Sequence, residues 1–366
     1  MTNLVLYRKY RPKLFSQMIG QEHIIKALTN EISSETVSHA YLFTGPRGSG
    51  KTTLARLLAK AVNCENRKKG DYEPCNECFS CLEINKGKAI DLIEIDAASN
   101  RGIDDVRSLK EGIEFAPTKF KYKVIIIDEC HQLSKDAANA LLKTLEEPPS
   151  HVLFVLATTE SNKMIPTIIS RCQRFDFKML NMKEIIEKLN IICKNEKAKI
   201  EESSLELIAA NSGGSIRDAE SMLDQVLGYG AVLGKEKISK DDVNNLLGLI
   251  DFQSVNQLID FLIQKKAKEA IECLNETLEK GKDPQQFAKS LISYLREILV
   301  LKIGSDMLDG FTKEEKEKIK AQTEKFSEEN IKTILKLFME AENEMRYSSI
   351  PQLPIELAIT EYCGIV

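Results

Sequence analysis

The amino-acid sequence predicts an α/β P-loop domain, with a parallel sheet covered by helices on both faces, followed by all-helical domains. Three observations predict this. Between residues 40 and 180, short apolar runs alternate with helical patterns, which is typical of parallel strands buried on both faces. A glycine-rich motif at residues 45–52 follows one of these runs and opens a helix. After residue 177 the apolar residues recur only at helical spacing.

The composition is that of an ordinary globular protein of two or three domains. The 366 residues are 43% hydrophobic and 29% charged, which excludes collagen-like, mucin-like and largely disordered chains. Lys and Arg number 51 against 55 Asp and Glu, so the net charge is −4 and any nucleic-acid contact must come from a local patch or from assembly. Residues 1–9 lack the apolar core of a signal peptide, and no stretch of about eighteen apolar residues is free of charge. We therefore expect a cytoplasmic protein without a membrane partner.

Each predicted element follows from its own residues. The expected strands are the apolar runs 40–43, 92–95, 124–127 and 152–157. Ser215 is expected to cap a helix, whose apolar stripe is Ile216, Ala219, Met222, Leu223, Val226 and Leu227. A later helix carries the stripe Val255, Leu258, Ile259, Leu262 and Ile263. These patterns predict an α/β domain at 1–179, a small helical domain at 180–243 and a larger all-helical domain at 244–366.

Residues 45–52, Gly-Pro-Arg-Gly-Ser-Gly-Lys-Thr, fit the phosphate-binding pattern G-x-x-x-x-G-K-[ST]. Glycines let the backbone wrap around phosphates, whose charge is met by N–H groups and a helix N-terminus. Lys51 is expected to reach the β- and γ-phosphates, and Thr52 to hold Mg²⁺. The residues expected to hold the nucleotide here are Gly45, Pro46, Arg47, Gly48, Ser49, Gly50, Lys51, Thr52 and Thr53. An accidental glycine-rich turn is the alternative, and the predicted strand and helix beside the motif argue against it.

An acidic pair follows the strand at 124–127. Asp128 is expected to hold Mg²⁺, directly or through water, and Glu129 to polarise the attacking water, because α/β sheets bind ligands at the carboxyl ends of their strands. A solvated acidic turn is the alternative, and the phosphate-binding motif makes it the weaker one. The neighbouring Cys130 and His131 receive no catalytic role, since phosphoryl transfer needs neither.

Four cysteines within eighteen residues predict a structural metal site. Cys64, Cys75, Cys78 and Cys81 lie in an inserted loop and offer four soft thiolates, which suit tetrahedral Zn²⁺ and leave no position for a reactive water. An iron–sulfur cluster is the second choice, because the fourth ligand lies upstream and no Cys-Pro follows Cys81. Free cysteines are the remaining alternative.

The order of these motifs resembles that of the AAA+ clamp-loader ATPases, and among them the gamma/tau family of bacterial DNA polymerase III. The motifs cover about residues 4–220, and beyond them the resemblance rests on helical character and length. Besides the P-loop and the acidic pair, the segments that carry it are Tyr7-Arg8-Lys9-Tyr10-Arg11-Pro12, Ile19-Gly20-Gln21-Glu22-His23, Ala-Leu-Leu-Lys-Thr-Leu-Glu-Glu-Pro-Pro at 140–149, Ala157-Thr158-Thr159, Ser170-Arg171-Cys172 and Gly213-Gly214-Ser215-Ile216-Arg217-Asp218.

The resemblance implies catalytic roles for three residues beside Lys51 and Glu129. Thr159 matches the polar residue that senses the γ-phosphate, and Arg217 matches a second sensor carried by a helical lid. Arg171 matches an arginine finger that acts in trans, on ATP held by the adjacent subunit. Such a finger is typically worth about 10³ to 10⁵ in rate.

The resemblance also implies two sets of binding residues. Tyr7, Arg11, Ile19 and Gly20 match the boxes on the adenosine side of the nucleotide. Ser99, Asn100 and Arg101 are similar to the segment that faces the DNA duplex inside the ring. We expect recognition of the DNA backbone and its shape, since no base-reading element is evident.

As a function, the resemblance implies an ATPase within the DNA-directed DNA polymerase III complex, a motor subunit that opens the sliding clamp and loads it onto primer–template DNA during replication. It implies ATP, Mg²⁺ and Zn²⁺ as cofactors. The implied partners are the delta and delta-prime subunits, further copies of this chain, the sliding clamp and the DNA. Residues 180–243 are then the lid, and 244–366 the oligomerisation collar, of a cytoplasmic replisome protein at the nucleoid.

Two alternatives come from other classes. One is a non-catalytic scaffold such as the delta-prime subunit, whose P-loop is typically degraded, whereas the motif here is intact. The other is a different AAA+ machine, either a branch-migration helicase motor or an archaeal or eukaryotic clamp-loader small subunit. Those proteins lack a four-cysteine insertion after the P-loop helix.

Overall fold

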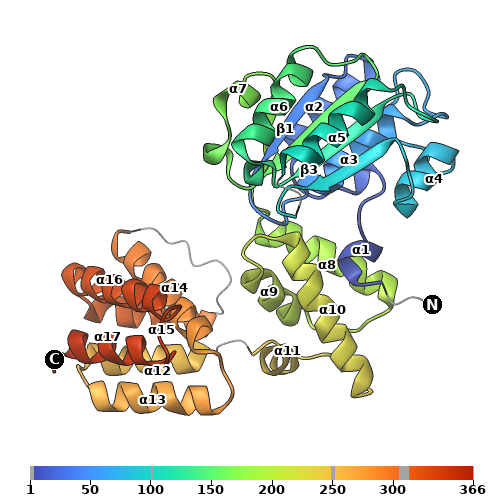
Figure 1. The fold of residues 1–366 in the computed structure, drawn as a ribbon. Helices are drawn as coiled ribbons and strands as arrows, with labels where there is room; N and C mark the ends of the chain where they lie inside the picture. The colour runs from blue at the N-terminus through green and yellow to red at the C-terminus, as the bar shows by residue number, and fades with distance from the viewer. Residues whose placement is uncertain (1–3, 100–101, 249–251, 305–312, 366) are drawn as a thin grey trace. The chain divides into compact units, whose positions relative to one another are not determined.

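The computed structural model describes residues 4–99, 102–248, 252–304 and 313–365 (Figure 1). The chain divides into two compact units. Met1–Ala198 with Ile208–Gln225 forms the first, and Lys199–Leu207 with Val226–Val366 forms the second. Among the helices that the structure describes, none combines the length and apolar character that a membrane span requires.

A parallel sheet forms the centre of the first unit, which confirms the predicted fold class. Its strands are β1 (Ala40–Thr44), β2 (Leu92–Asp96), β3 (Lys123–Asp128), β4 (Val152–Thr158) and β5 (Gln173–Asp176). They lie in the order β2-β3-β4-β1-β5, and every neighbouring pair is parallel. The four predicted apolar runs are β1 to β4. The edge strand β5 was not among those runs, because its Gln173 and Arg174 are exposed and its sequence is correspondingly polar.

Helices cover both faces of this sheet (Figure 1). The helices and short 3₁₀ turns before the end of the sheet are α1 (Leu6–Lys9), η1 (Phe15–Gln17), α2 (Glu22–Ser33), α3 (Lys51–Val62), α4 (Phe79–Lys86), α5 (Ile103–Glu114), η2 (Cys130–Gln132), α6 (Lys135–Glu146), η3 (Ser161–Lys163) and α7 (Pro166–Ile169). Successive residues of a strand point to opposite faces. Accordingly, Val124 and Ile126 of β3 pack into the core with α2 and α3, while Ile125 and Ile127 pack into the core with α5 and α6.

Three helices follow the sheet: α8 (Met182–Glu196), α9 (Glu202–Asn211) and α10 (Ile216–Val232). The predicted cap of α10 is confirmed, because Ser215 Oγ accepts a hydrogen bond from the Asp218 N–H at 3.3 Å. Ala219, Leu223 and Val226 of its predicted stripe are buried. Tertiary packing therefore uses the stripe that helical spacing indicated.

In the part that the structure describes, the second unit consists of helices, their connecting loops and an isolated bridge between Ile200 and Ile238. It includes the start of α9 and the end of α10. Its further helices are α11 (Lys240–Leu246), α12 (Phe252–Ile263), α13 (Ala267–Glu279), α14 (Pro284–Lys302), α15 (Lys313–Lys325), α16 (Glu328–Glu344) and α17 (Leu353–Cys363). Side chains from α12 to α17 form one hydrophobic core. Inside it, Tyr294 donates a hydrogen bond to Gln322 Oε1 at 2.6 Å and accepts one from Asn256 Nδ2 at 3.1 Å. These buried polar groups are thus paired, as their burial requires.

Candidate functional site

A cavity of about 450 Å³ lies in the first unit, beside the turn that follows β1 and the end of β3. The carboxyl ends of parallel strands are where α/β sheets bind ligands. The predicted residues that line this cavity are Tyr7, Arg11, Ile19, Arg47, Gly48, Ser49, Gly50, Lys51, Thr52, Thr53, Asp128, Glu129 and Arg217. Segments separated by about 200 positions in the sequence therefore converge on one site.

The glycine-rich turn and the first turn of α3 form one side of the cavity. Gly48 has a φ of +74°, and a Cβ at this position would lie 1.9 Å from Ser215 Oγ, so only glycine fits without a shift. The Ile216 N–H donates to the Gly48 carbonyl at 3.3 Å, which joins the turn to the start of α10. Lys51 is buried, and its Nζ donates to the carbonyls of Gly45 and Pro46 at 2.7 and 2.8 Å.

Charged residues of both signs line the cavity. Burial lowers the pKa of Lys51, and the carboxylates of Glu129 and Asp128 oppose that shift. Thr52 Oγ1 donates to Asp128 Oδ2 at 2.8 Å, so the two residues expected to hold Mg²⁺ are in direct contact. A hydroxyl and a carboxylate oxygen are ligands that Mg²⁺ accepts. The residues present therefore fit the ion.

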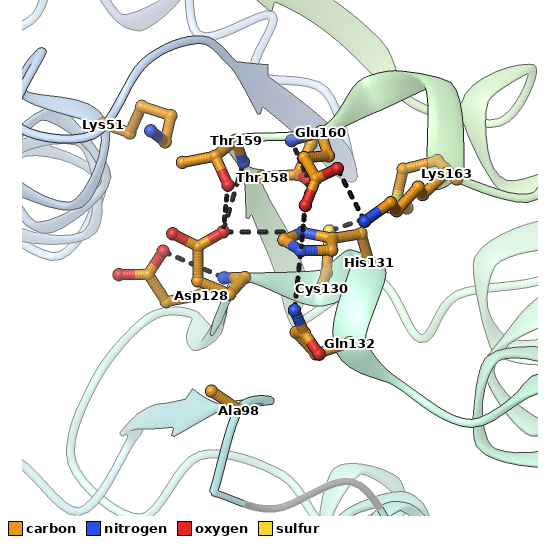
Figure 2. Close-up of polar contacts among 12 residues, drawn as sticks. Lys51, Ala98, Asp128, Cys130, His131, Gln132, Thr158, Thr159, Glu160 and Lys163 are labelled. Atoms are coloured by element: carbon orange, nitrogen blue, oxygen red, sulfur yellow. Dashed lines mark hydrogen bonds and ion pairs between the residues drawn. The ribbon is translucent and has the colours of Figure 1, made fainter. Parts of the chain in front are cut away.

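Glu129 is held by several contacts at the end of β3. Its φ of +48° places it in the left-handed region, which costs a residue other than glycine about 1–2 kcal/mol. Thr159 donates to Glu129 Oε2 from its hydroxyl at 2.8 Å and from its N–H at 3.2 Å. Thr159 thus reaches the site through Glu129 (Figure 2). The backbone strain and the fixed carboxylate are typical of a functional position.

His131, to which the sequence assigned no role, is part of this network (Figure 2). Its side chain is only 4% exposed, and its Nδ1 lies 3.4 Å from Glu129 Oε2 and 2.9 Å from Thr158 Oγ1. On the other side of the ring, Nε2 lies 3.4 Å from Glu160 Oε1, and Glu160 forms an ion pair with Lys163 at 2.7 Å. His131 therefore contacts the Glu129 carboxylate without lining the cavity.

Residues of the segment 7–19 line the cavity as well. The guanidinium of Arg217 lies 4.9 Å from the ring centroid of Tyr7, within the range of a cation–π contact. Arg11 and Ile19 are also among the lining residues. Gly20 follows this segment, and a Cβ there would lie 2.9 Å from the Leu180 side chain.

The remaining predicted residues lie outside the cavity. Arg171 forms an ion pair with Glu146 and donates to the Thr167 carbonyl at 2.7 Å, in a separate hollow that also contains His39 and Cys172. Ser99 is exposed, and its N–H donates to the Asp96 carbonyl at 3.1 Å. Asn100 and Arg101, the other two residues expected at DNA, lie outside the described residues.

Three charged residues of the cavity were missed by sequence reasoning. Asp96 is the last residue of β2 and is in register with Asp128. Because α/β sheets bind ligands at the carboxyl ends of their strands, its position after an apolar run could have predicted it. Lys188 of α8 and Glu220 of α10 are buried with Nζ and Oε1 3.8 Å apart. Burial lowers the pKa of Lys188 and raises that of Glu220 to about 7. No local pattern marks this pair, because its partners lie far apart in the sequence.

The four predicted metal ligands come together. The Sγ atoms of Cys64, Cys75, Cys78 and Cys81 all lie within 4.8 Å of one another, and those of Cys75 and Cys81 are 4.0 Å apart. A tetrahedral site with Zn–S bonds of about 2.3 Å places its sulfurs about 3.8 Å apart. Burial raises the pKa of Cys75, but N–H donors from Glu77 and Cys78 outweigh it and lower that pKa to about 7. The cluster therefore fits a closed zinc centre.

Comparison with protein-family models divides the chain into three matched stretches. Residues 20–181 match "DNA polymerase III, delta subunit", residues 184–241 match "DNA polymerase III clamp loader subunit, ATPase lid domain", and residues 238–364 match "DNA polymerase III subunits gamma and tau domain III".

Similar curated proteins are tau and gamma subunits of DNA polymerase III. The chain is 42% identical to the DNA polymerase III subunit tau of Bacillus subtilis over 99% of its own length and 64% of that protein's. It is 39% identical to the Escherichia coli tau subunit over 84% of its own length and 48% of that protein's. It is 37% identical to the gamma subunit of Buchnera aphidicola over 97% of both chains. The chain thus spans only part of the tau proteins and nearly the whole of the gamma protein.

The fold is similar to that of a solved AAA+ motor. The RuvB Holliday junction branch migration motor of Thermotoga maritima matches with a TM-score of 0.50 and 21% identity, over 75% of this chain and 86% of that one. At that identity the likeness concerns the fold alone. The family follows from the sequence matches, in which a gamma subunit is similar over its whole length: the chain belongs to the gamma/tau family of clamp-loader subunits of bacterial DNA polymerase III.

Proposed function

We propose that this chain is an ATP-hydrolysing motor subunit of the DNA polymerase III clamp loader, which uses ATP to open the sliding clamp and load it onto primer–template DNA. One observation carries the proposal: Lys51, Thr52, Asp128 and Glu129 converge in one cavity together with Arg217. A scaffold subunit does not need this set, so its presence favours the motor over a delta-prime-like scaffold.

The proposed mechanism assigns a task to each of these residues. The N–H groups of the P-loop and Lys51 hold the phosphates, and Thr52 and Asp128 hold Mg²⁺, which when bound neutralises charge on the phosphates. Glu129 orients and polarises the attacking water. Thr159, which donates to the Glu129 carboxylate, is proposed to sense the γ-phosphate from the neighbouring strand.

Two arginines are proposed to couple hydrolysis to movement and assembly. Arg217 opens α10 and lines the cavity, so its contact with the nucleotide can make the position of α10 depend on the nucleotide bound. Arg171 lines a separate hollow and is not among the residues of this cavity, which supports a role as a finger for ATP in an adjacent subunit. It would there offset charge that develops in the transition state.

The proposal includes three domains, cofactors and partners. The proposed domains are the AAA+ domain at 1–179, the lid at 180–243 and the oligomerisation collar at 244–366. The end of β5 at Asp176 and the three stretches that the family models match support this division. ATP, Mg²⁺ and structural Zn²⁺ are the cofactors. The proposed partners are delta, delta-prime, further copies of the chain, the sliding clamp, and primer–template DNA near Ser99. The proposed location is the replisome in the cytoplasm.

The test is the steady-state ATPase rate of the chain, alone and mixed with delta, delta-prime, sliding clamp and primed DNA. We expect the mixture to raise hydrolysis strongly. Arg171→Ala is expected to lose that gain by about 10³-fold or more while it still binds ATP. A rate that ignores clamp and junction DNA would contradict the clamp-loader function and favour another AAA+ motor.

A further inference from the structure

The four-cysteine segment, residues 64–81, contacts residues 13–16 near the N-terminus. Metal binding does not require these contacts. The carboxylate of Glu73 accepts hydrogen bonds from the Phe15 N–H at 2.9 Å and from the Ser16 N–H at 2.8 Å, one on each oxygen. Asn76 Nδ2 donates to the Lys13 carbonyl at 3.2 Å. Hydrogen bonds to a charged acceptor are stronger than neutral ones. About 60 residues of sequence separate the two sides of these contacts.

Apolar and cationic contacts reinforce the same junction. Phe15 is fully buried, and its ring meets that of Tyr72 edge to face with centroids 6.3 Å apart. Lys60 of α3 is buried as well, and its Nζ donates to the Lys13 carbonyl and to Asn76 Oδ1, both at 2.7 Å. The cysteine segment, α3 and residues 13–16 are thus joined as one packed unit.

Residues 13–16 depend on these contacts for their shape. The 3₁₀ turn η1 (Phe15–Gln17) is only three residues long, and its cap residue Leu14 makes no side-chain cap hydrogen bond. The first N–H groups of such a turn need an acceptor. Glu73 supplies it from a distant part of the sequence, in the place of a local capping residue.

The turn η1 leads directly into the wall of the nucleotide cavity. Pro12, Gln17 and Met18 line the cavity, and Lys13 N–H donates to Gln17 Oε1 at 2.8 Å. Pro12, Met18 and Ile19 offer the cavity an apolar surface, which suits a base rather than phosphates. A shift of residues 13–16 therefore moves this apolar part of the lining.

We propose that Glu73 is a positioning residue for nucleotide binding, through which the four-cysteine segment holds residues 12–18 as the nucleoside-side wall of the cavity. This inference rests on the proposed function, in that it requires ATP to bind in this cavity. It assigns the cysteine segment a task beyond its own folding. The phosphate side, formed by the P-loop, is not directly touched by Glu73.

The experiment compares two ligands by isothermal titration calorimetry of the full chain: ADP, and inorganic tripolyphosphate, which has no nucleoside. Apparent affinity falls in proportion to the fraction of molecules in the competent conformation. A Glu73→Ala variant in which about one molecule in ten keeps the wall in place binds ADP about tenfold more weakly. Its affinity for tripolyphosphate stays within about twofold of the wild type.

Two further variants make the comparison sharper. Glu73→Gln keeps one acceptor oxygen and is expected to show an intermediate loss for ADP. Glu77→Ala removes an exposed carboxylate of the same segment and is expected to bind both ligands like the wild type. Zinc content and thermal unfolding of each variant show whether the cysteine cluster remains intact.

Each remaining result overturns a defined statement. Wild-type ADP affinity in Glu73→Ala, or an equal loss for ADP and tripolyphosphate, would overturn the positioning role. If Glu73→Ala loses its zinc and also its affinity for both ADP and tripolyphosphate, the positioning role is overturned as well, since Glu73 would then act on the fold as a whole. A wild-type chain that binds neither ligand contradicts the proposed function itself.

Discussion

A substitution at Gly48 tests whether the P-loop and the start of α10 are packed as tightly as the structure shows. Alanine at a φ of +74° costs about 1–2 kcal/mol of backbone strain. Its Cβ would also lie 1.9 Å from Ser215 Oγ and 2.9 Å from Ser215 Cβ. The Ser215 hydroxyl can turn away only if it loses its cap hydrogen bond with the Asp218 N–H, which is worth about 1 kcal/mol. The Ser215 Cβ can move away only together with its backbone.

The backbone strain and the lost cap bond add to about 2–3 kcal/mol for Gly48→Ala, and the movement of the backbone raises that total. Gly213→Ala is the matched control, because Gly213 has a φ of +59° and no atom near its Cβ position. It should lose only the strain of about 1–2 kcal/mol. The double variant Gly48→Ala with Ser215→Gly removes both clashing atoms, and glycine is tolerated at a helix cap at a cost of a few tenths of a kcal/mol. It should recover the difference between Gly48→Ala and the control.

The assay is urea-induced unfolding of the four proteins, with ADP affinity measured beside it. A cost that is equal in the free and the bound protein leaves affinity unchanged. If ADP binding restores about 1–2 kcal/mol of the clash that the free variant relaxes, the affinity of Gly48→Ala falls five- to thirtyfold. Equal losses of stability in Gly48→Ala and Gly213→Ala, or no recovery in the double variant, would refute the packing argument.

Three further predictions follow from the site. Glu129→Gln should lower clamp-stimulated hydrolysis by about 10² to 10⁴ while ADP affinity stays within about threefold, since the amide still accepts from Thr159; unchanged hydrolysis in a rate assay would rule out the base role. Burial raises the pKa of Glu220 to about 7. The protonated carboxyl therefore contributes its full share to the free energy of unfolding below about pH 4.3, and this contribution is lost as the pH rises through 7. Glu220→Gln should therefore gain about 2 kcal/mol over the wild type between pH 5 and pH 8 in urea unfolding; a constant difference would contradict the buried carboxyl. A zinc chelator should speed amide hydrogen exchange in residues 64–86 and leave β3 and β4 protected, and no change in 64–86 would argue against a metal-ordered segment.

The elements that the sequence predicted are those whose chemistry is local. The strands β1 to β4 are continuous apolar runs, the P-loop needs its glycines at adjacent positions, and the four cysteines lie within one short loop. In each case the residues that act together are neighbours in the chain. Their spacing alone then indicates the structure, as it did for the cap at Ser215.

The elements that the sequence did not predict depend on partners from distant segments. The edge strand β5 has polar, exposed residues, so no apolar run marks it. The buried pair of Lys188 and Glu220 joins two helices, and neither residue stands out in its own helix. His131 was set aside on chemical grounds, and only the fold shows it against the Glu129 carboxylate.

The class of the fold, the glycine-rich turn, the acidic pair and the cysteine cluster follow from the amino-acid sequence alone, because each is encoded by residue types at short, regular spacing. Which distant side chains share the cavity depends on how the whole chain folds. The fold places Tyr7 against Arg217 and Glu73 against Phe15 and Ser16. A hydrogen bond or a packed contact depends on distance in space, and the distance between remote segments is set by the packing of the whole core.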